Sequence, residues 1–217
     1  METAAFLRKI RGELADLNRR ITEHPYLLEA EKGTLSKGKL RRFVENQFYV
    51  VHHDARSLAQ MVHRSRGSVE AQYFTKLLQG DLAAFEQLQA LGGELGVTFT
   101  EFHRLKLLPE ATAYTHYLAW LSVFANPGEQ AFAIIVNLPV WGTACSRLGR
   151  ALRERYGLRR TGFLDAFATL PDWVEAEGLE IVGSYLPGSG PRMRLIGRMI
   201  QAYEKSFWDA VYGGPGG

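Results

Sequence analysis

The 217-residue sequence has a single cysteine, Cys145, and no long hydrophobic run. One cysteine excludes an internal disulfide and a metal site built from thiolates alone. The most apolar run, residues 131–141, is interrupted by Asn137 and is much shorter than the roughly 20 residues of a membrane-spanning helix. Residues 1–8 lack the basic-then-apolar pattern of a secretion signal. We therefore expect a soluble, cytoplasmic protein that does not enter a membrane.

An excess of charge of one sign is also missing. The chain has 26 Lys and Arg against 23 Asp and Glu, a formal net charge of +3, which is too low by itself to indicate a polyanionic partner. The arginines between Arg147 and Arg160 lie near the expected end of a helix, where the helix dipole favours cations. We therefore expect no nucleic-acid partner. A hydrophobic content of 46% with 23% charged residues excludes an intrinsically disordered chain.

Helical periodicity is the strongest pattern that the sequence does contain. Apolar residues recur every three or four positions, as in the stripe from Leu40 to Val62, and no segment alternates as a strand would. Thr98 with Glu101 is typical of a capping box for a short helix. The longer helices are predicted over residues 10–21, 36–66, 69–91, 110–124 and 129–155. Two more are predicted after these: one begins near residue 169, and the last one ends near residue 211. The first half of the 129–155 segment is apolar on all sides, which predicts a central, buried helix.

These elements predict an all-α bundle of about seven or eight helices. We expect one domain over residues 1–212, followed by a flexible glycine-rich tail over residues 213–217. The segment from Pro187 to Pro191, with the sequence PGSGP, is typical of a hinge or loop between the last two helices.

Glu204 is the first candidate for chemistry. It follows Ile200 by four residues and precedes Phe207 by three, which places it at the border of an apolar helix face. A half-buried carboxyl group in such surroundings has a raised pKa, which suits acid–base work. The alternative is an ordinary surface glutamate paired with a neighbouring Arg or Lys side chain.

Three further sets of residues leave alternatives open. Glu45 and His52 lie two helical turns apart, so they either share a hard metal ion or form a solvated polar edge. Cys145 is either an activated thiol or a buried, inert one. Tyr114 opens a series of aromatic residues at helical spacing that belongs either to the core or to the wall of a pocket.

Three segments, taken in order, resemble the TenA and PqqC families. They are HPYLLEAEKGTLSKGKLRRFVENQFYVV (24–51), NLPVW (137–141) and YEKSFWDAVY (203–212), which are similar to the opening, central and closing motifs of these families. The resemblance spans nearly the whole chain. It implies an all-α, heme-oxygenase-like multi-helix bundle with a ligand pocket between the central helices. It also implies a homodimer or homotetramer.

The functional residues of the family carry over unevenly. In thiaminase-type TenA proteins an aspartate holds the aminopyrimidine and a cysteine is the nucleophile, and the matching positions here are Phe48 and Val140. Their replacement argues against thiaminase-type hydrolysis. The resemblance retains the closing glutamate as Glu204 and a tyrosine as Tyr114. PqqC-like oxidases use arginine and glutamine where Gln47 and Val51 stand, which argues against that role as well.

The sequence therefore leaves three hypotheses. The first is a divergent enzyme, a TenA-like hydrolase or a PqqC-like oxidoreductase, that acts on a small, largely apolar or heterocyclic molecule without a metal or other cofactor. In it Glu204 is the catalytic acid–base, and the substrate-binding residues are Phe48, Val51, Tyr114, Val140, Trp141 and Tyr203. The second is a non-catalytic protein that binds a small-molecule ligand in the same pocket. The third is a metal-dependent oxidase of the same fold that uses Glu45 and His52.

Overall fold

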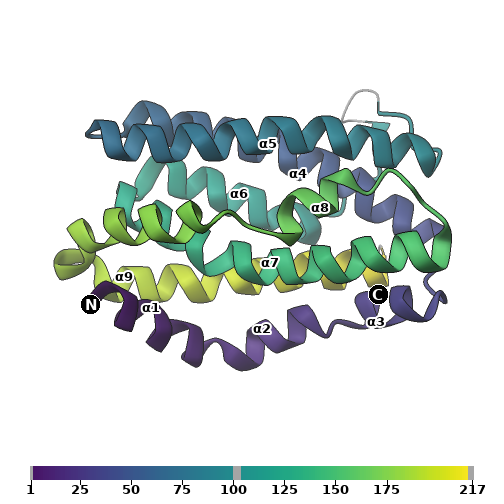
Figure 1. Ribbon diagram of the computed structural model, residues 1–217, viewed down its shortest axis with the longest axis horizontal. Coiled ribbons are helices and arrows are strands. Elements are labelled where there is room, and N and C mark those ends of the chain that lie inside the picture. The colour runs from purple at the N-terminus through teal and green to yellow at the C-terminus, as the bar shows by residue number, and fades with distance from the viewer. Residues whose placement is uncertain (1, 100–103, 215–217) are drawn as a thin grey trace.

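The computed structural model describes residues 2–99 and 104–214, and within this part of the chain the regular structure is helical, with no strand. This confirms the predicted all-α class. Figure 1 shows α4 and α5 along one long side, α1 to α3 along the opposite side, and α6 to α9 between them. The helices are α1 (Glu2–Glu13), α2 (Ala15–Thr22), α3 (Pro25–Lys32), α4 (Lys37–Arg64), α5 (Ser68–Glu94), α6 (Pro109–Phe124), α7 (Pro127–Tyr156), α8 (Gly162–Ala168) and α9 (Asp172–Gly213).

Local signals explain several of the helix ends. The Ser36 hydroxyl accepts a hydrogen bond from the Lys39 amide at 3.3 Å and caps α4. Asn126 and Glu129 form a reciprocal capping box at the start of α7. α7 ends at Gly157, whose φ of 66° is a left-handed conformation that glycine adopts without strain.

The structure differs from the predicted helices at three places. The first helix is divided at Leu14 into α1 and α2. A short helix that was not predicted, α8, lies between the segment 129–155 and the one that begins near residue 169. The backbone of residues 187–191 is helical and belongs to α9, so no loop separates two helices there. Two neighbouring contacts support this backbone: Ser189 accepts a hydrogen bond from Asn126 Nδ2 at 2.9 Å, and the Met193 side chain is fully buried. Tertiary packing thus outweighs the low helix propensity of the segment.

The chain nevertheless reverses its direction within α9. A straight helix of 42 residues would be about 63 Å long, and Figure 1 shows α9 turning back at the left end of the molecule. Both arms of the helix therefore border one interior space: Trp173 in the first arm and Glu204 in the second line the same cavity. The prolines of the bend, Pro187 and Pro191, each lack the amide that a regular helix would use.

α7 is the central helix. It packs against α9, α8, α3 and α2, and its first eleven residues, 127–137, are all buried, which confirms the prediction. Among the described residues, it is also the one helix whose length and hydropathy would suffice for a membrane span, but 67% of that apolar window is buried inside the protein. Such burial is typical of the core helix of a soluble protein.

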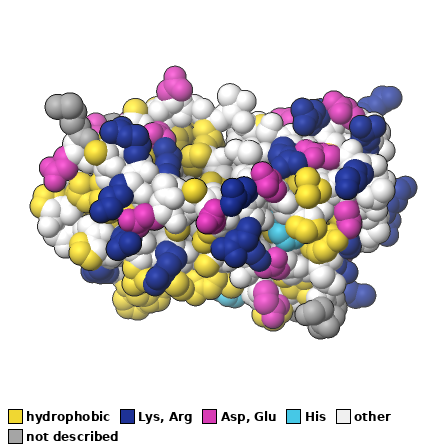
Figure 2. Space-filling view, turned by 90° about the horizontal axis from the view of Figure 1, so that it is seen from below, with side chains coloured by type: hydrophobic (Ala, Val, Ile, Leu, Met, Phe, Trp, Pro, Cys, Tyr) yellow, Lys and Arg dark blue, Asp and Glu magenta, His cyan; other side chains and the backbone are white. Residues whose placement is uncertain are grey.

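The surface opposite α5 carries charges of both signs. Figure 2, seen from below, shows Lys and Arg side chains interspersed with Asp and Glu over this face.

Two predicted features lie partly outside the described residues. The capping box of Thr98 and Glu101 extends into residues 100–103, outside the described residues. Of the predicted tail, Gly213 ends α9 and Gly214 caps it, whereas residues 215–217 lie outside the described part.

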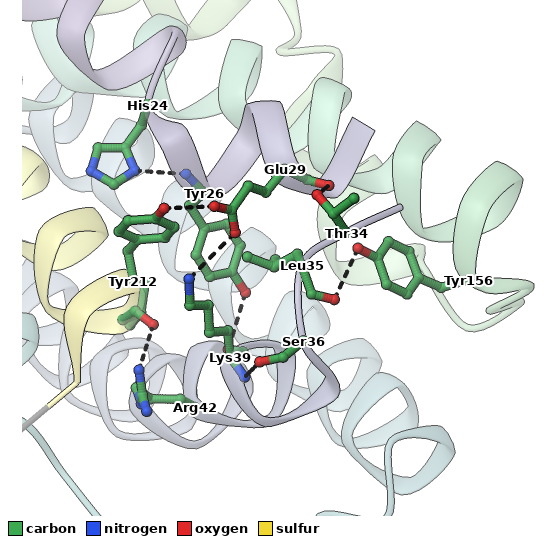
Figure 3. A network of polar contacts seen from close by, with 11 residues as sticks. His24, Tyr26, Glu29, Thr34, Leu35, Ser36, Lys39, Arg42, Tyr156 and Tyr212 are labelled. Carbon is green, nitrogen blue, oxygen red and sulfur yellow. Dashed lines mark hydrogen bonds and ion pairs between the residues drawn. The ribbon is translucent and has the colours of Figure 1, made fainter. Parts of the chain in front are cut away.

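A polar network fixes the last turns of α9 to α3 and α4 (Figure 3). The Tyr212 hydroxyl donates to Glu29 Oε1 at 2.6 Å, and Lys39 Nζ donates to Glu29 Oε2 at 3.3 Å. Lys39 Nζ also lies 3.6 Å from the centre of the Tyr212 ring. On the neighbouring turn, His24 Nε2 and Asp209 Oδ1 are 3.1 Å apart. We call these five residues the α9 anchor, and they hold the helix turns that follow Glu204.

Candidate functional site

A cavity of about 420 Å³ lies between α4, α5, α6, α7, α8 and both arms of α9. Its volume is typical of a small-molecule site. Most of its wall is apolar, and the large apolar side chains are Val50, Val51, Leu58, Leu77, Leu118, Ile134, Leu138, Trp141, Phe163, Phe167, Leu170, Trp173, Val174 and Phe207. The polar side chains are fewer and come from every long helix that borders the cavity: Gln47, Asp54, Lys76, Asp81, Glu86, Gln87, Tyr114, Asn137 and Glu204.

Glu204 lies at the base of this cavity on the second arm of α9. Only 4% of the residue is exposed. Its Oε1 accepts a hydrogen bond from Trp208 Nε1 at 2.8 Å, one turn further along the helix, and its Oε2 accepts one from Asn137 Nδ2 at 3.4 Å. Burial raises the pKa of Glu204 to about 7, against the lowering effect of these two hydrogen bonds. The group can therefore both give and take a proton near neutral pH.

Asn137 connects Glu204 to a chain of polar side chains. Its Oδ1 accepts a hydrogen bond from the Tyr114 hydroxyl at 3.0 Å, and its Nδ2 donates to Gln201 Oε1 at 2.9 Å. Gln201 Nε2 in turn donates to Asn18 Oδ1 at 2.7 Å. Since each partner fixes the next, the orientation of the Asn137 amide is determined, and with it the side of Glu204 that faces the cavity.

Of the three other carboxyl groups that line the cavity, Glu86 is exposed at the opening, whereas Asp54 and Asp81 have raised pKa values. Asp54 belongs to α4 and Asp81 to α5. The pKa of Asp54 is raised well above its ordinary value by burial and by the nearby Asp81 charge. Burial raises the pKa of Asp81 to about 7. The pKa of the Tyr114 hydroxyl is raised by burial and by the charges of Asp54, Glu204 and Asp81, so these four groups form one electrostatic unit.

Aromatic rings form the floor beside Glu204. The Trp141 ring centre lies 6.0 Å from that of Phe167 and 6.1 Å from that of Phe207, both in edge-to-face geometry. Trp208 packs behind it at 5.7 Å. Rigid aromatic faces of this kind suit a flat ligand.

The cavity opens between α5 and the connection from α8 to α9. The exposed lining residues come from α5, from α8 and from the connection between α8 and α9, namely Gly80, Ala83, Glu86, Gln87, Ala166 and Pro171. At the edge of the opening, Lys76 Nζ lies 2.5 Å from a carboxylate oxygen of Glu177 and 4.5 Å from the centre of the Trp173 ring.

The structure brings four of the seven predicted site residues to this cavity. Val51, Tyr114, Trp141 and Glu204 line it, and their functional roles stay predictions. The other three, Phe48, Val140 and Tyr203, are not among its lining residues.

Helix geometry explains these three exceptions. Phe48 packs away from the cavity, with its ring centre 4.9 Å from that of Phe85, whereas Gln47 lines the cavity. A shift of one residue on a helix turns a side chain by about 100°. Val140 is buried in the core, and Tyr203 lies 5.2 Å from Tyr117, ring centre to ring centre.

The residues considered for a metal or a thiol lie elsewhere. Glu45 and His52 are on α4 but do not line the cavity. Within residues 2–99 and 104–214, no three His, Cys, Asp or Glu side chains are grouped so that they could hold a metal ion. Cys145 is fully buried, and burial raises the pKa of its thiol well above the ordinary value, as expected for an inert cysteine.

The pocket predicted from the sequence has apolar positions and a single carboxyl group, so it lacks the acids of the α4–α5 wall. A signal was present: Gln47, Val50, Asp54 and Leu58 follow one another at steps of three or four residues. A polar residue within such a stripe marks a place where an apolar helix face meets an interior space. Asp81 stands in the same relation to Leu77 and Ala84.

Comparisons with known proteins agree with this architecture. The family model described as TENA/THI-4/PQQC matches residues 11–214. No match was found among curated proteins. A solved TenA homolog from Pseudomonas syringae pv. tomato has a TM-score of 0.84 at 16% identity, with 99% of this chain and 96% of that chain covered. A TenA homologue from Pyrococcus furiosus has a TM-score of 0.79 at 18% identity, with 95% and 100% covered.

Heme oxygenase-1 from the cyanobacterium Synechocystis, solved in complex with heme, has a TM-score of 0.65 at 14% identity, with 96% of this chain and 92% of that chain covered. At such identities the solved structures show the fold, which is heme-oxygenase-like. The family match extends over almost the entire sequence and includes all the helices that border the cavity. The chain therefore belongs to the TENA/THI-4/PQQC family.

Proposed function

We propose that the protein is an acid–base enzyme that acts on a small, flat, largely apolar or heterocyclic molecule inside the cavity. One observation carries this proposal: Glu204 is buried at the base of an apolar cavity, has a pKa of about 7, and is held on both oxygens by hydrogen bonds. Carboxyl groups tuned to neutral pH in this way are typical of acid–base catalysts.

In this proposal the substrate lies against the Trp141 and Phe207 rings. Glu204 either donates a proton to the substrate atom that gains negative charge or removes a proton from an attacking water molecule. Tyr114 acts through Asn137 and keeps the carboxyl group aimed at the cavity. The buried position of Cys145, outside the cavity lining, favours chemistry with water over a covalent thiol intermediate.

Exchange of Glu204 for glutamine tests the proposal. The purified protein is incubated with a panel of nitrogen heterocycles, including substituted aminopyrimidines, and conversion is followed by mass spectrometry. Glu204→Gln should lower the rate for any converted compound at least 100-fold, whereas Glu180→Gln, an exposed change on the same helix, should leave it unchanged. An equal rate in Glu204→Gln would remove this residue from the mechanism.

The second hypothesis, a non-catalytic binding protein, predicts a different result from the same panel. Compounds would bind in the cavity without conversion at any pH. The expected homodimer or homotetramer stays a prediction, and light scattering of the purified chain tests it.

A further inference from the structure

The α4–α5 wall of the cavity contains carboxyl oxygens for which the described residues supply no partner. Oδ1 of Asp54 and Oδ2 of Asp81 are buried and have no hydrogen-bond partner in this part of the chain, whereas the Asp54 side chain has one hydrogen bond, with Thr115. Their own helices contribute no hydrogen bond to these two atoms, and both side chains line the cavity. A buried polar oxygen without a partner is costly, so its presence in a folded protein calls for an explanation.

The titratable groups around this wall are almost all acids. Asp54 and Asp81 act on each other, and the Glu204 charge also reaches Asp54. Tyr114 is the fourth titratable neighbour. Lys76 is the one Lys or Arg among the described lining residues, and Glu177 already pairs with its ammonium group at the cavity edge. No basic side chain of the described chain therefore neutralises the two aspartates.

The surroundings of the acids select the kind of positive charge that would fit. A hard metal ion needs several oxygen ligands, and no group of three suitable side chains exists in the described residues. An organic cation needs fewer anionic ligands because its body packs against apolar surface. The walls next to the acids supply that surface through Val50, Leu58 and Leu118.

We infer that Asp54 and Asp81 form a receptor for an organic cation, a protonated amine or amidine group on an otherwise flat and apolar molecule. The inference rests on the proposed function and names the charge class of its substrate. The cationic end of the ligand lies between α4 and α5, and its apolar body extends toward Trp141 and Glu204. Asp54 and Asp81 are thus residues that determine specificity, and Glu204 remains the acid–base.

Binding of such a cation has a signature that a neutral ligand lacks. In the free protein burial raises the pKa of both aspartates, to about 7 for Asp81, so each binds a proton at higher pH than an ordinary aspartate does. A cation seated between them favours the ionised forms, so protons leave when it binds. The apparent affinity for a cation should therefore increase with pH, while the affinity for a neutral ligand should not.

Benzamidine and benzamide are suitable probes because they have the same flat shape and differ in charge. Calorimetric titration at pH 8 should show benzamidine binding at least 10-fold more tightly than benzamide. At pH 7, titrations in two buffers of different ionisation enthalpy should show proton release with benzamidine alone. The same shape in both probes means that packing against the apolar wall cancels in the comparison.

Variants identify the residues responsible. Asp54→Asn and Asp81→Asn should each reduce the preference for benzamidine to less than about 3-fold, since one carboxylate is removed without loss of volume. Asp172→Asn changes the net charge equally at an exposed position near the opening and should retain the full preference.

The possible results separate the inference from the proposed function. Equal binding of the two probes without proton release leaves the cavity as a ligand site and overturns the cation receptor. A preference that disappears in Glu204→Gln but persists in both aspartate variants overturns it as well. If neither probe binds, the cavity does not accept flat aromatic molecules, and both proposals fail.

Discussion

The α9 anchor and the cavity both contain carboxyl groups, but the pKa values of these groups are shifted in opposite directions. In the anchor, the Tyr212 hydroxyl bonded to Glu29, together with Lys39, holds the pKa of that carboxyl group below its ordinary value. In the cavity, burial raises the pKa of Glu204, Asp81 and Asp54. About one turn of α9 separates Glu204 from the anchor residue Asp209, so the two environments meet within a few residues.

This contrast distinguishes carboxyl groups that stabilise the folded state at neutral pH from carboxyl groups that destabilise it. A carboxylate with donors around it favours the folded state at neutral pH. A carboxyl group whose pKa is raised by burial disfavours that state once it ionises, and such groups are typical of functional sites. Stability alone therefore does not explain the three cavity acids with raised pKa values, Asp54, Asp81 and Glu204.

The largest effect is expected where the two regions meet, at Trp208. This ring is fully buried, packs against Tyr26 and Phe43, and donates to Glu204. Trp208→Ala should lower the free energy of unfolding by about 3–5 kcal/mol, because it leaves a cavity and removes the donor to Glu204. Urea unfolding measures the change. Stability within 1 kcal/mol of the natural protein would show that the two regions are independent.

The pH dependence of stability gives the next largest effect. The pKa of Glu204 is about 7 in the folded protein against an ordinary value of 4.5. Its contribution to stability is therefore complete below about pH 4.5 and is lost as the pH rises through 7. Because glutamine does not ionise, Glu204→Gln should match the natural protein at pH 4.5 and exceed it by about 2–4 kcal/mol at pH 8.

Thermal unfolding of both proteins between pH 4.5 and 8 measures this difference, in which the contributions of all other groups cancel. Two parallel stability curves would mean that Glu204 is ionised throughout and is not tuned for proton exchange.

A pair of smaller changes tests the contrast directly. Glu29→Gln in the anchor should lower the free energy of unfolding at pH 8 by less than about 1 kcal/mol, since the pair with Lys39 is partly exposed. Asp81→Asn in the cavity should raise it by about 1–2 kcal/mol, because a buried charge without a partner is removed. Denaturant titration detects both. Changes of the same sign would abolish the distinction between the two regions.

The sequence predicted the helices well and the cavity in part. The stripe from Leu40 to Val62 identified α4, and the position of Glu204 between Ile200 and Phe207 marked the inward face of α9. Periodicity gives the direction of a side chain around a helix but not the depth of the space that it faces. For this reason periodicity alone does not place Asp54 in the cavity, and the family resemblance points to Phe48 where the structure has Gln47. Neither can be corrected without knowing where α5 packs.

The segment from Pro187 to Pro191 shows a further limit. Its composition indicated an interruption, and the chain does reverse there, yet helical hydrogen bonding continues because neighbouring side chains fix the backbone. Local propensity describes a peptide in water, whereas these residues lie against Asn126 and the rest of the bundle.

The bend in α9 also restricts which changes in length the chain can tolerate. Trp173 borders the cavity from one arm and Glu204 from the other, and a helix turns by about 100° with each added residue. One residue inserted between Gly188 and Gly190 would rotate the second arm as a unit and carry the acid out of the cavity. Substitutions at the bend leave this register intact, so variation in relatives should appear there as exchanges of residue type at constant length.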